Sequence, residues 1–193
     1  MRFILLRYRR LLKWGIVGVL LIVGILLLSG LYGKVSGVFD QGEREVPIYA
    51  VDTKEKKLAI SFDAAWGADC TPTLLKILKE NDIKTTFYLT GIWVKKYPEV
   101  VKTIAAAGHE LGNHSSTHPH CNSLSEEEFI KELKDTEEMI FKLSKQRTRL
   151  FRPPFGEYNN TNIKAARKNG YEVIQWSVDS LDWQELGGEA QVD

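Results

Sequence analysis

All four histidines of the chain, His109, His114, His118 and His120, lie within twelve residues. His114 and His118 are four residues apart, and on a helical turn this spacing places both rings on one side, within reach of one ion. Neutral imidazole is the most common protein ligand for metals such as zinc. A packed or surface pair would show the same spacing, so the prediction of a metal site depends on the other motifs. His109, before a strand, and His120, after a proline, are expected to have other roles.

Other reactive side chains lie where predicted strands end. Asp63 ends an apolar run at residues 58–64, where a carboxylate can bind metal, act as a general base or cap a turn. Arg152 precedes two prolines that stiffen its loop. It can pair with a carboxylate and keep it ionised, or lie on the surface. Asp182 and Trp183 follow the last predicted strand, and Trp183 suits either a core or the wall of a sugar site.

Strands and helices alternate along the chain. Alternating, β-branched and aromatic patterns predict strands at residues 58–64, 85–91, 109–114 and 171–180, and residues 149–156 are expected to form a strand that runs into a proline turn. Apolar spacing predicts helices at 71–82, 98–108, 123–146 and 160–170, the third with a capping box formed by Ser125 and Glu128. This order indicates a mainly parallel sheet covered by helices, either a barrel or a doubly wound sheet. In both folds the chemistry gathers at the ends of the strands.

The N-terminal part differs in composition from the rest. Residues 1–39 hold six basic side chains and no acid, and residues 14–33 form an uncharged apolar run of 20 residues. This length spans a bilayer as a helix, and the basic flank favours a cytoplasmic N-terminus. A cleaved signal peptide is the alternative. We expect a membrane anchor at 1–34, a linker at 35–57 and an extracytoplasmic domain at 58–193. The basic charge lies beside the apolar run, so no nucleic-acid partner is expected.

Four short motifs resemble one known family. They are SFD (61–63), HSSTH (114–118), RPPFG (152–156) and DSLDW (179–183). In this order they are similar to those of polysaccharide deacetylases, the NodB-homology domains of carbohydrate esterase family 4. The resemblance covers roughly residues 58–193, and the SFDAAWG form with an anchor is most similar to the subset linked to spore formation. It implies a distorted (β/α) barrel that removes N-acetyl groups from an amino-sugar polymer.

The resemblance also implies roles for single residues. Asp63 would be the general base, and His114 and His118 would hold a divalent metal, with zinc or another transition metal expected. Water on that metal would attack the acetamide carbonyl. Arg152 would orient Asp63.

Further roles concern the oxyanion, the leaving group and the acetyl pocket. The metal and a backbone N–H near Phe155 would stabilise the oxyanion. Asp182 would act on a histidine that protonates the departing amine, and Trp183 would line the acetyl pocket.

The sequence departs from the family pattern in three places. The usual second acid, a metal ligand, is replaced by Ala64, so Asp69 or water is expected as a third ligand. Phe155 stands where the family has tyrosine. No histidine follows His120, so the family's late catalytic histidine is missing and we expect a domain that is incomplete at its C-terminus.

Two functions remain in competition. The first is an anchored deacetylase of a cell-wall polymer, with peptidoglycan as the expected substrate. The second is a sugar-binding remnant without turnover. The enzyme is favoured by Asp63, Arg152 and Asp182, because a protein that only binds sugar has little need of a general base or of residues that tune it. The remnant is favoured by Ala64 and by the missing histidine.

Overall fold

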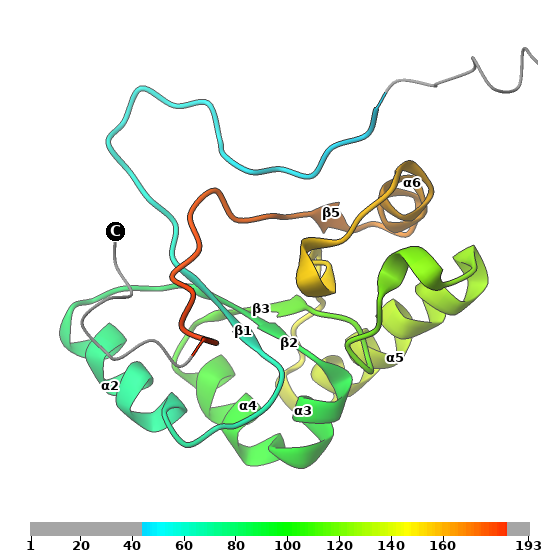
Figure 1. Cartoon of the computed structure of the whole chain (residues 1–193). Coiled ribbons are helices and arrows are strands. Elements are labelled where there is room, and N and C mark those ends of the chain that lie inside the picture. The colour runs from blue at the N-terminus through cyan, green and yellow to red at the C-terminus, as the bar shows by residue number, and fades with distance from the viewer. Residues whose placement is uncertain (1–43, 185–193) are drawn as a thin grey trace, which may run out of the picture. The chain divides into compact units, whose positions relative to one another are not determined.

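The computed structural model describes residues 44–184, in which five parallel strands form one sheet (Figure 1). The strands pair in chain order: β1 (Ser61–Ala64), β2 (Thr86–Leu89), β3 (Glu110–Asn113), β4 (Leu150–Phe151) and β5 (Glu172–Val173). The expected parallel α/β architecture is confirmed. Within residues 44–184, β1 and β5 are the outer strands and do not pair with each other, so no closed barrel is seen there.

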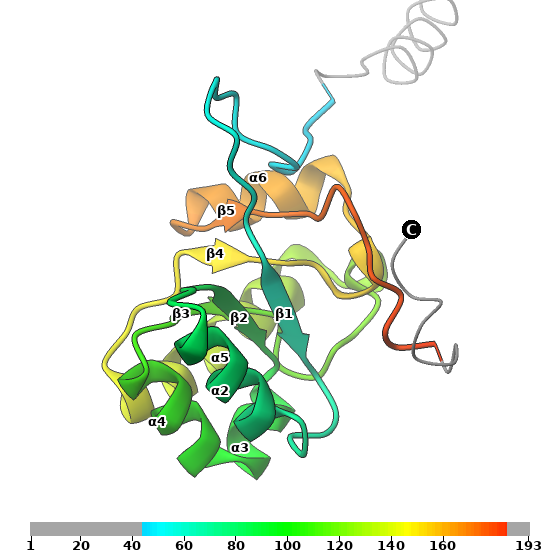
Figure 2. The same cartoon turned by 90° about the vertical axis from the view of Figure 1, so that its left-hand side faces the viewer.

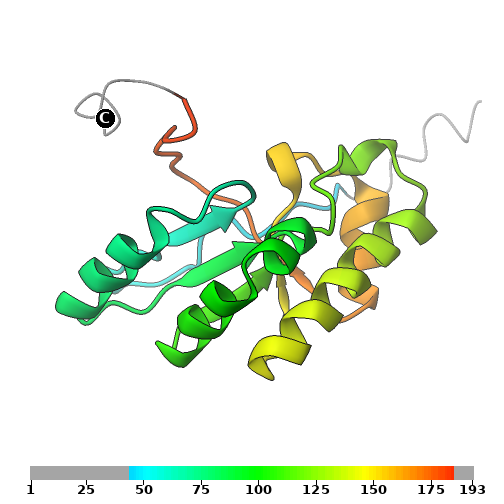
Figure 3. The ribbon, with the colours of Figure 1, turned by 90° about the horizontal axis from the view of Figure 1, so that it is seen from below.

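Helices connect the strands. They are α2 (Thr71–Glu80), α3 (Gly91–Lys96), α4 (Pro98–Ala106), α5 (Glu126–Ser144) and α6 (Asn160–Lys168), with short 3₁₀ turns η1 (Cys121–Ser123) and η2 (Pro154–Gly156). Seen from below, α2, α4 and α5 run side by side under the sheet (Figure 3), and α6 lies beside β5 (Figure 2). The capping box predicted for α5 is present, with Ser125 accepting from the Glu128 amide.

Two apolar clusters form the core of the folded unit. The first gathers side chains of β2, α3 and α4, including fully buried Leu89, Trp93 and Ile104. The second gathers side chains of α5, β4 and α6, including Phe129 and Phe151, whose rings meet edge to face. Burial of such side chains contributes about 1.5–3 kcal/mol each. The clusters therefore fix the strands from which the candidate site projects.

Two elements differ from the sequence prediction. Helix α3 was not predicted, because its Ile-Trp-Val composition lacks a helical stripe; Thr90 caps it by accepting from the Trp93 amide. The strand predicted at 171–180 is only Glu172–Val173. After it, Ile174 forms a single bridge with Ile48, and the chain leaves the sheet.

Residues 45–49, placed by the sequence in a linker, pack against the folded unit. Ile48 donates to the Val173 carbonyl at 2.8 Å, and Glu45 forms an ion pair with Arg167. The predicted membrane anchor at 1–34 lies outside the described residues. Among residues 44–184, no helix is long and apolar enough to cross a membrane.

Candidate active site

The carboxyl ends of neighbouring parallel strands bring three of the predicted site residues together. Asp63 lies in β1, His114 follows β3 and Arg152 follows β4. Strand pairing places Asp63 beside Tyr88 of β2 and Asn113 beside Phe151. Side chains far apart in the sequence therefore meet at one edge of the sheet, as parallel α/β folds require.

Arg152 is the side chain that joins this group. Its Nη1 donates to Asp63 Oδ1 at 2.8 Å, and its guanidinium lies 4.0 Å from the centre of the Tyr88 ring. The Arg152 side chain is 7% exposed, whereas that of Asp63 is 31% exposed. The arginine is thus a buried support that holds a carboxylate open to solvent on one side.

The Tyr88 ring packs directly against Gly112 of the neighbouring strand β3. A Cβ atom on Gly112 would lie 2.4 Å from Tyr88 Cδ1, so only glycine leaves room for the ring. Burial raises the pKa of Tyr88 to about 12, and the ring remains a neutral phenol under Arg152. Gly112 and Tyr88 are supporting residues that sequence reasoning did not identify.

His114 is held in one tautomer by the Arg152 backbone. Its Nδ1 lies 2.7 Å from the Arg152 carbonyl oxygen, which can only accept, so Nδ1 carries the proton. The Nε2 lone pair is then free, 3.8 Å from Asp63 Oδ2. Burial lowers the pKa of His114, although the nearby Asp63 charge opposes this. A neutral imidazole therefore faces the carboxylate.

His118 approaches His114, but not through the predicted helical turn. Residues 114–118 form a loop in which Ser115 and His118 adopt positive φ values of 66° and 58°. The two rings lie 5.0 Å apart, centre to centre. Burial, and then His114, lower the pKa of His118. The two rings are thus neighbours, but residues 114–118 form a loop and not the helical turn on which the prediction was based.

Two helices fix this histidine loop (residues 114–118). Glu132 of α5 accepts hydrogen bonds from the amides of Ser116 and Thr117, at 2.8 and 2.7 Å. At the start of α3, the Gly91 and Ile92 amides donate to the carbonyls of Ser115 and Ser116, each at 2.9 Å. The loop geometry is therefore set by α3 and α5 and cannot be read from the spacing of the histidines.

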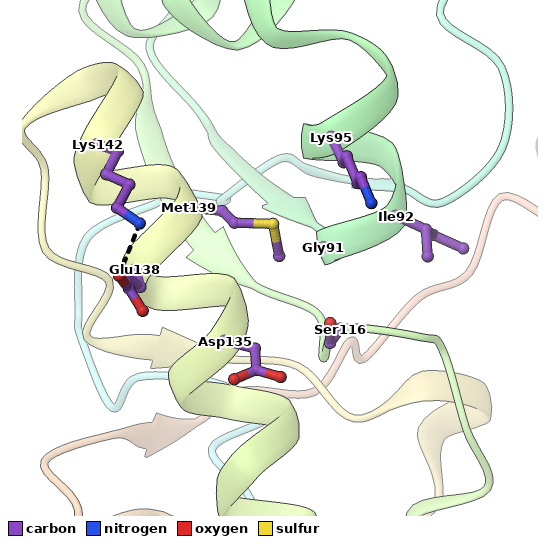
Figure 4. Close-up of a pocket in the computed structure, with 8 residues that line it drawn as sticks. All are labelled: Gly91, Ile92, Lys95, Ser116, Asp135, Glu138, Met139 and Lys142. Carbon is purple, nitrogen blue, oxygen red and sulfur yellow. Dashed lines mark ion pairs between the residues drawn. The ribbon is translucent and has the colours of Figure 1, made fainter.

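A separate pocket of about 380 Å³ lies behind this loop, between α3 and α5 (Figure 4). Its walls include Ile92, Met139 and an ion pair between Lys142 and Glu138. None of the predicted catalytic or metal-binding side chains lines it. Gly91 at its rim lies close to the histidine loop, because an added Cβ would lie 3.0 Å from Ser116 Cα and would displace the side chains of Ser116 and Met139.

The imidazoles fit a metal, but no complete ligand set is seen. In residues 44–184 no three His, Cys, Asp or Glu side chains are arranged to hold an ion. Asp69, predicted as a possible third ligand, is exposed and does not join the histidines in such a group. His118 Nδ1 is buried without a hydrogen-bond partner, and His114 Nε2 is free. Two neutral nitrogen atoms are thus available to a metal, one fewer than the three protein ligands of a typical catalytic zinc site.

Of the remaining predicted residues, Phe155 lies beside the histidines, whereas Asp182 and Trp183 lie apart from them. Phe155, with φ 58°, sits next to His118, their ring centres 4.6 Å apart. Asp182 is exposed and accepts from Ser180, and Trp183 is 73% exposed. In the described part of the chain, neither makes a hydrogen bond or ring contact with the histidines. Residues 174–184 contain no strand that would bring them closer.

Comparison with known proteins decides the family. Residues 50–174 match the polysaccharide deacetylase family. The chain belongs to this family. A peptidoglycan-N-acetylglucosamine deacetylase of Bacillus cereus is 36% identical over 128 residues, which are 66% of this chain and 46% of that protein. The peptidoglycan-N-acetylmuramic acid deacetylase PdaA of Bacillus subtilis is 32% identical over 74% of this chain and 54% of that protein.

Solved structures of the same family are also similar to this chain, and they include both a deacetylase and a pseudoenzyme. The PdaA structure superposes with a TM-score of 0.69 at 31% identity, covering 72% of this chain and 60% of that one. A family 4 pseudoenzyme from Bacillus anthracis superposes equally well, with a TM-score of 0.69 at 38% identity, covering 72% of this chain and 49% of that one. The chain spans about half the length of the curated relatives it matches. Membership of the spore-linked subset stays a prediction.

Proposed function

We propose that this polysaccharide deacetylase removes N-acetyl groups from an amino-sugar polymer of the cell wall, with peptidoglycan as the substrate. The arrangement of Asp63, Arg152 and His114 carries the proposal. One arginine fixes the carboxylate through its side chain and the imidazole through its carbonyl. Relatives named as peptidoglycan deacetylases support the substrate class.

Each oxygen of Asp63 has a distinct role in this proposal. Oδ1 accepts from Arg152, which fixes the orientation of the carboxylate. Oδ2 lies 3.8 Å from His114 Nε2 and remains able to take a proton from water that attacks the acetamide carbonyl. The backbone near Phe155 would donate to the oxyanion, because η2 begins just after Arg152.

His114 and His118 would hold the metal. A divalent ion, with zinc expected, lowers the pKa of bound water and polarises a carbonyl when it is present. The lowered pKa values of both histidines keep them neutral and able to bind it. Because Ala64 offers no carboxylate, we expect weaker binding than with three protein ligands.

A sugar-binding remnant is the second candidate. The favourable match to a family 4 pseudoenzyme and the presence of Ala64 support it. Acetate assays separate the two functions. The enzyme releases acetate from peptidoglycan when zinc is supplied, whereas the remnant binds peptidoglycan in a pull-down assay and releases none.

We further propose that residues 1–34 anchor the protein with its N-terminus inside and the deacetylase domain outside. The uncharged run at 14–33 and its basic flank support this. Protease added to intact cells should then remove the domain. Full protection of the domain from protease would contradict this topology.

A further inference from the structure

Trp66, in the loop between β1 and α2, is an exposed aromatic side chain beside the site. It is 71% exposed, and its ring lies 5.7 Å from that of His118, centre to centre, at an angle of 58°. Tryptophan carries a large apolar surface with one polar N–H, and it is common where sugars and other amphipathic ligands bind. Because little of the Trp66 ring is buried, the ring contributes little to the stability of the fold. The fold therefore gives no reason for a tryptophan at this position.

The exposure of Trp66 is not the result of a loose loop. On one side of it, the Thr90 amide donates to the Ala64 carbonyl at 3.1 Å. On the other side, the indole of Trp93 donates to the Gly67 carbonyl at 2.8 Å, and Trp93 is itself only 1% exposed. The backbone on both sides is thus tied to the core, and the ring is presented by a fixed support.

A second aromatic side chain, Phe155 of another loop, also contacts His118. Phe155 of η2 meets His118 edge to face, and His120 stacks on Phe155 with ring centres 4.4 Å apart and 15° between planes. His120 Nδ1 is 2.9 Å from Glu157 Oε1, so a polar pair borders the stack. His118 therefore contacts two aromatic side chains, one from the β1–α2 loop and one from the β4–α6 loop.

We propose that Trp66 positions the substrate polymer by stacking on a pyranose ring next to the one that is deacetylated. This inference rests on the proposed function, because the occupant is an amino-sugar chain whose acetamide reaches Asp63. Pyranose faces expose C–H groups and their edges expose hydroxyls. Trp66 suits the faces, and the pair of His120 and Glu157 suits the hydroxyls. Trp66 is then a positioning residue and takes no part in proton transfer.

The effect is expected in affinity for long substrates. An aromatic contact of this kind changes binding by about two- to tenfold. Trp66→Ala should weaken binding by that factor, and Trp66→Phe should retain most of it. Ile77→Ala is the matched control, since Ile77 is also an exposed apolar side chain but lies on α2.

The test uses the full chain with Asp63→Asn, so that no turnover disturbs binding, and a hexamer of N-acetylglucosamine as the probe. Calorimetric titration should show the loss with Trp66→Ala, its rescue with Trp66→Phe and no change with Ile77→Ala. Equal affinity in all variants, or no binding by the parent, would overturn the inference. Acetate release by the chain with native Asp63 is measured separately. Binding that depends on Trp66 without acetate release would refute the proposed enzyme and leave this inference standing.

Discussion

Arg152 Nη1 donates to Asp63 Oδ1 at 2.8 Å, joining two residues that are 89 positions apart in the sequence. The same arginine stacks on Tyr88 and offers its carbonyl to His114. A single residue thus contacts both, the base through its side chain and one imidazole through its backbone carbonyl. This relationship makes Arg152 the most informative position to change.

Arg152→Lys should lower kcat/KM by about 10²-fold, because lysine keeps the charge but loses the planar group that spans Asp63 and Tyr88. Steady-state acetate release with a chitin oligomer measures this. Lys142→Ala is a surface control, since the Lys142 side chain is exposed and forms an ion pair with exposed Glu138. Wild-type kcat/KM in Arg152→Lys would contradict the positioning role.

Glu132→Ala should loosen the histidine loop, because it removes the acceptor of the Ser116 and Thr117 amides. We expect roughly 10–100-fold weaker zinc binding, the range seen when groups that orient metal ligands are lost. Zinc titration monitored by calorimetry tests it. Glu138→Ala on the same helix is exposed and should bind zinc as the wild type does. Equal affinity in both variants would show that Glu132 does not fix the loop.

Replacing His114 or His118 by alanine should abolish zinc binding, since each removes one of two nitrogen donors. Asp69→Ala should leave zinc affinity unchanged, because the structure does not group Asp69 with the histidines. Ala64→Asp should raise it by restoring the carboxylate of the family pattern. Equilibrium dialysis with zinc measures all four. Unchanged binding in both histidine variants would place the metal elsewhere, and a loss with Asp69→Ala would restore it as a ligand.

His109 should make folding sensitive to acid. Burial, and then Lys84, lower its pKa from the ordinary value of 6.5. Below about pH 6.5, His109 is protonated more readily in the unfolded chain than in the folded chain. The free energy of unfolding therefore falls as the pH drops. Urea unfolding at pH 7.5 and 5.5 should show this loss, and His109→Gln should show a smaller one. An equal loss in both proteins would contradict the role of His109.

Much of the fold could be predicted because its signals are local. The capping box of Ser125 and Glu128 and the alternating apolar runs specify α5 and the parallel strands directly. The family resemblance implied that Arg152 orients Asp63, and the structure places the two in contact.

The remainder depends on tertiary contacts that carry no short-range signal. The conformation of the histidine loop is set by Glu132 and by α3, and nothing in the HSSTH spacing reveals either. Trp66 and Gly112 matter through neighbours on other elements. The strand predicted at 171–180 ends early because the chain leaves the sheet after residue 174, and Val178 beyond that point is 79% exposed.

Acetate release by the zinc-loaded full chain, compared with Asp63→Asn, tests the central claim most directly. Asparagine keeps an acceptor for Arg152 but cannot take a proton, so the fold should persist while the rate falls by about 10²–10⁴-fold. Release from peptidoglycan by the wild type, with this loss in the variant, is the predicted result. No release by the folded wild type, or equal rates in both proteins, would contradict a deacetylase that uses Asp63 as its base.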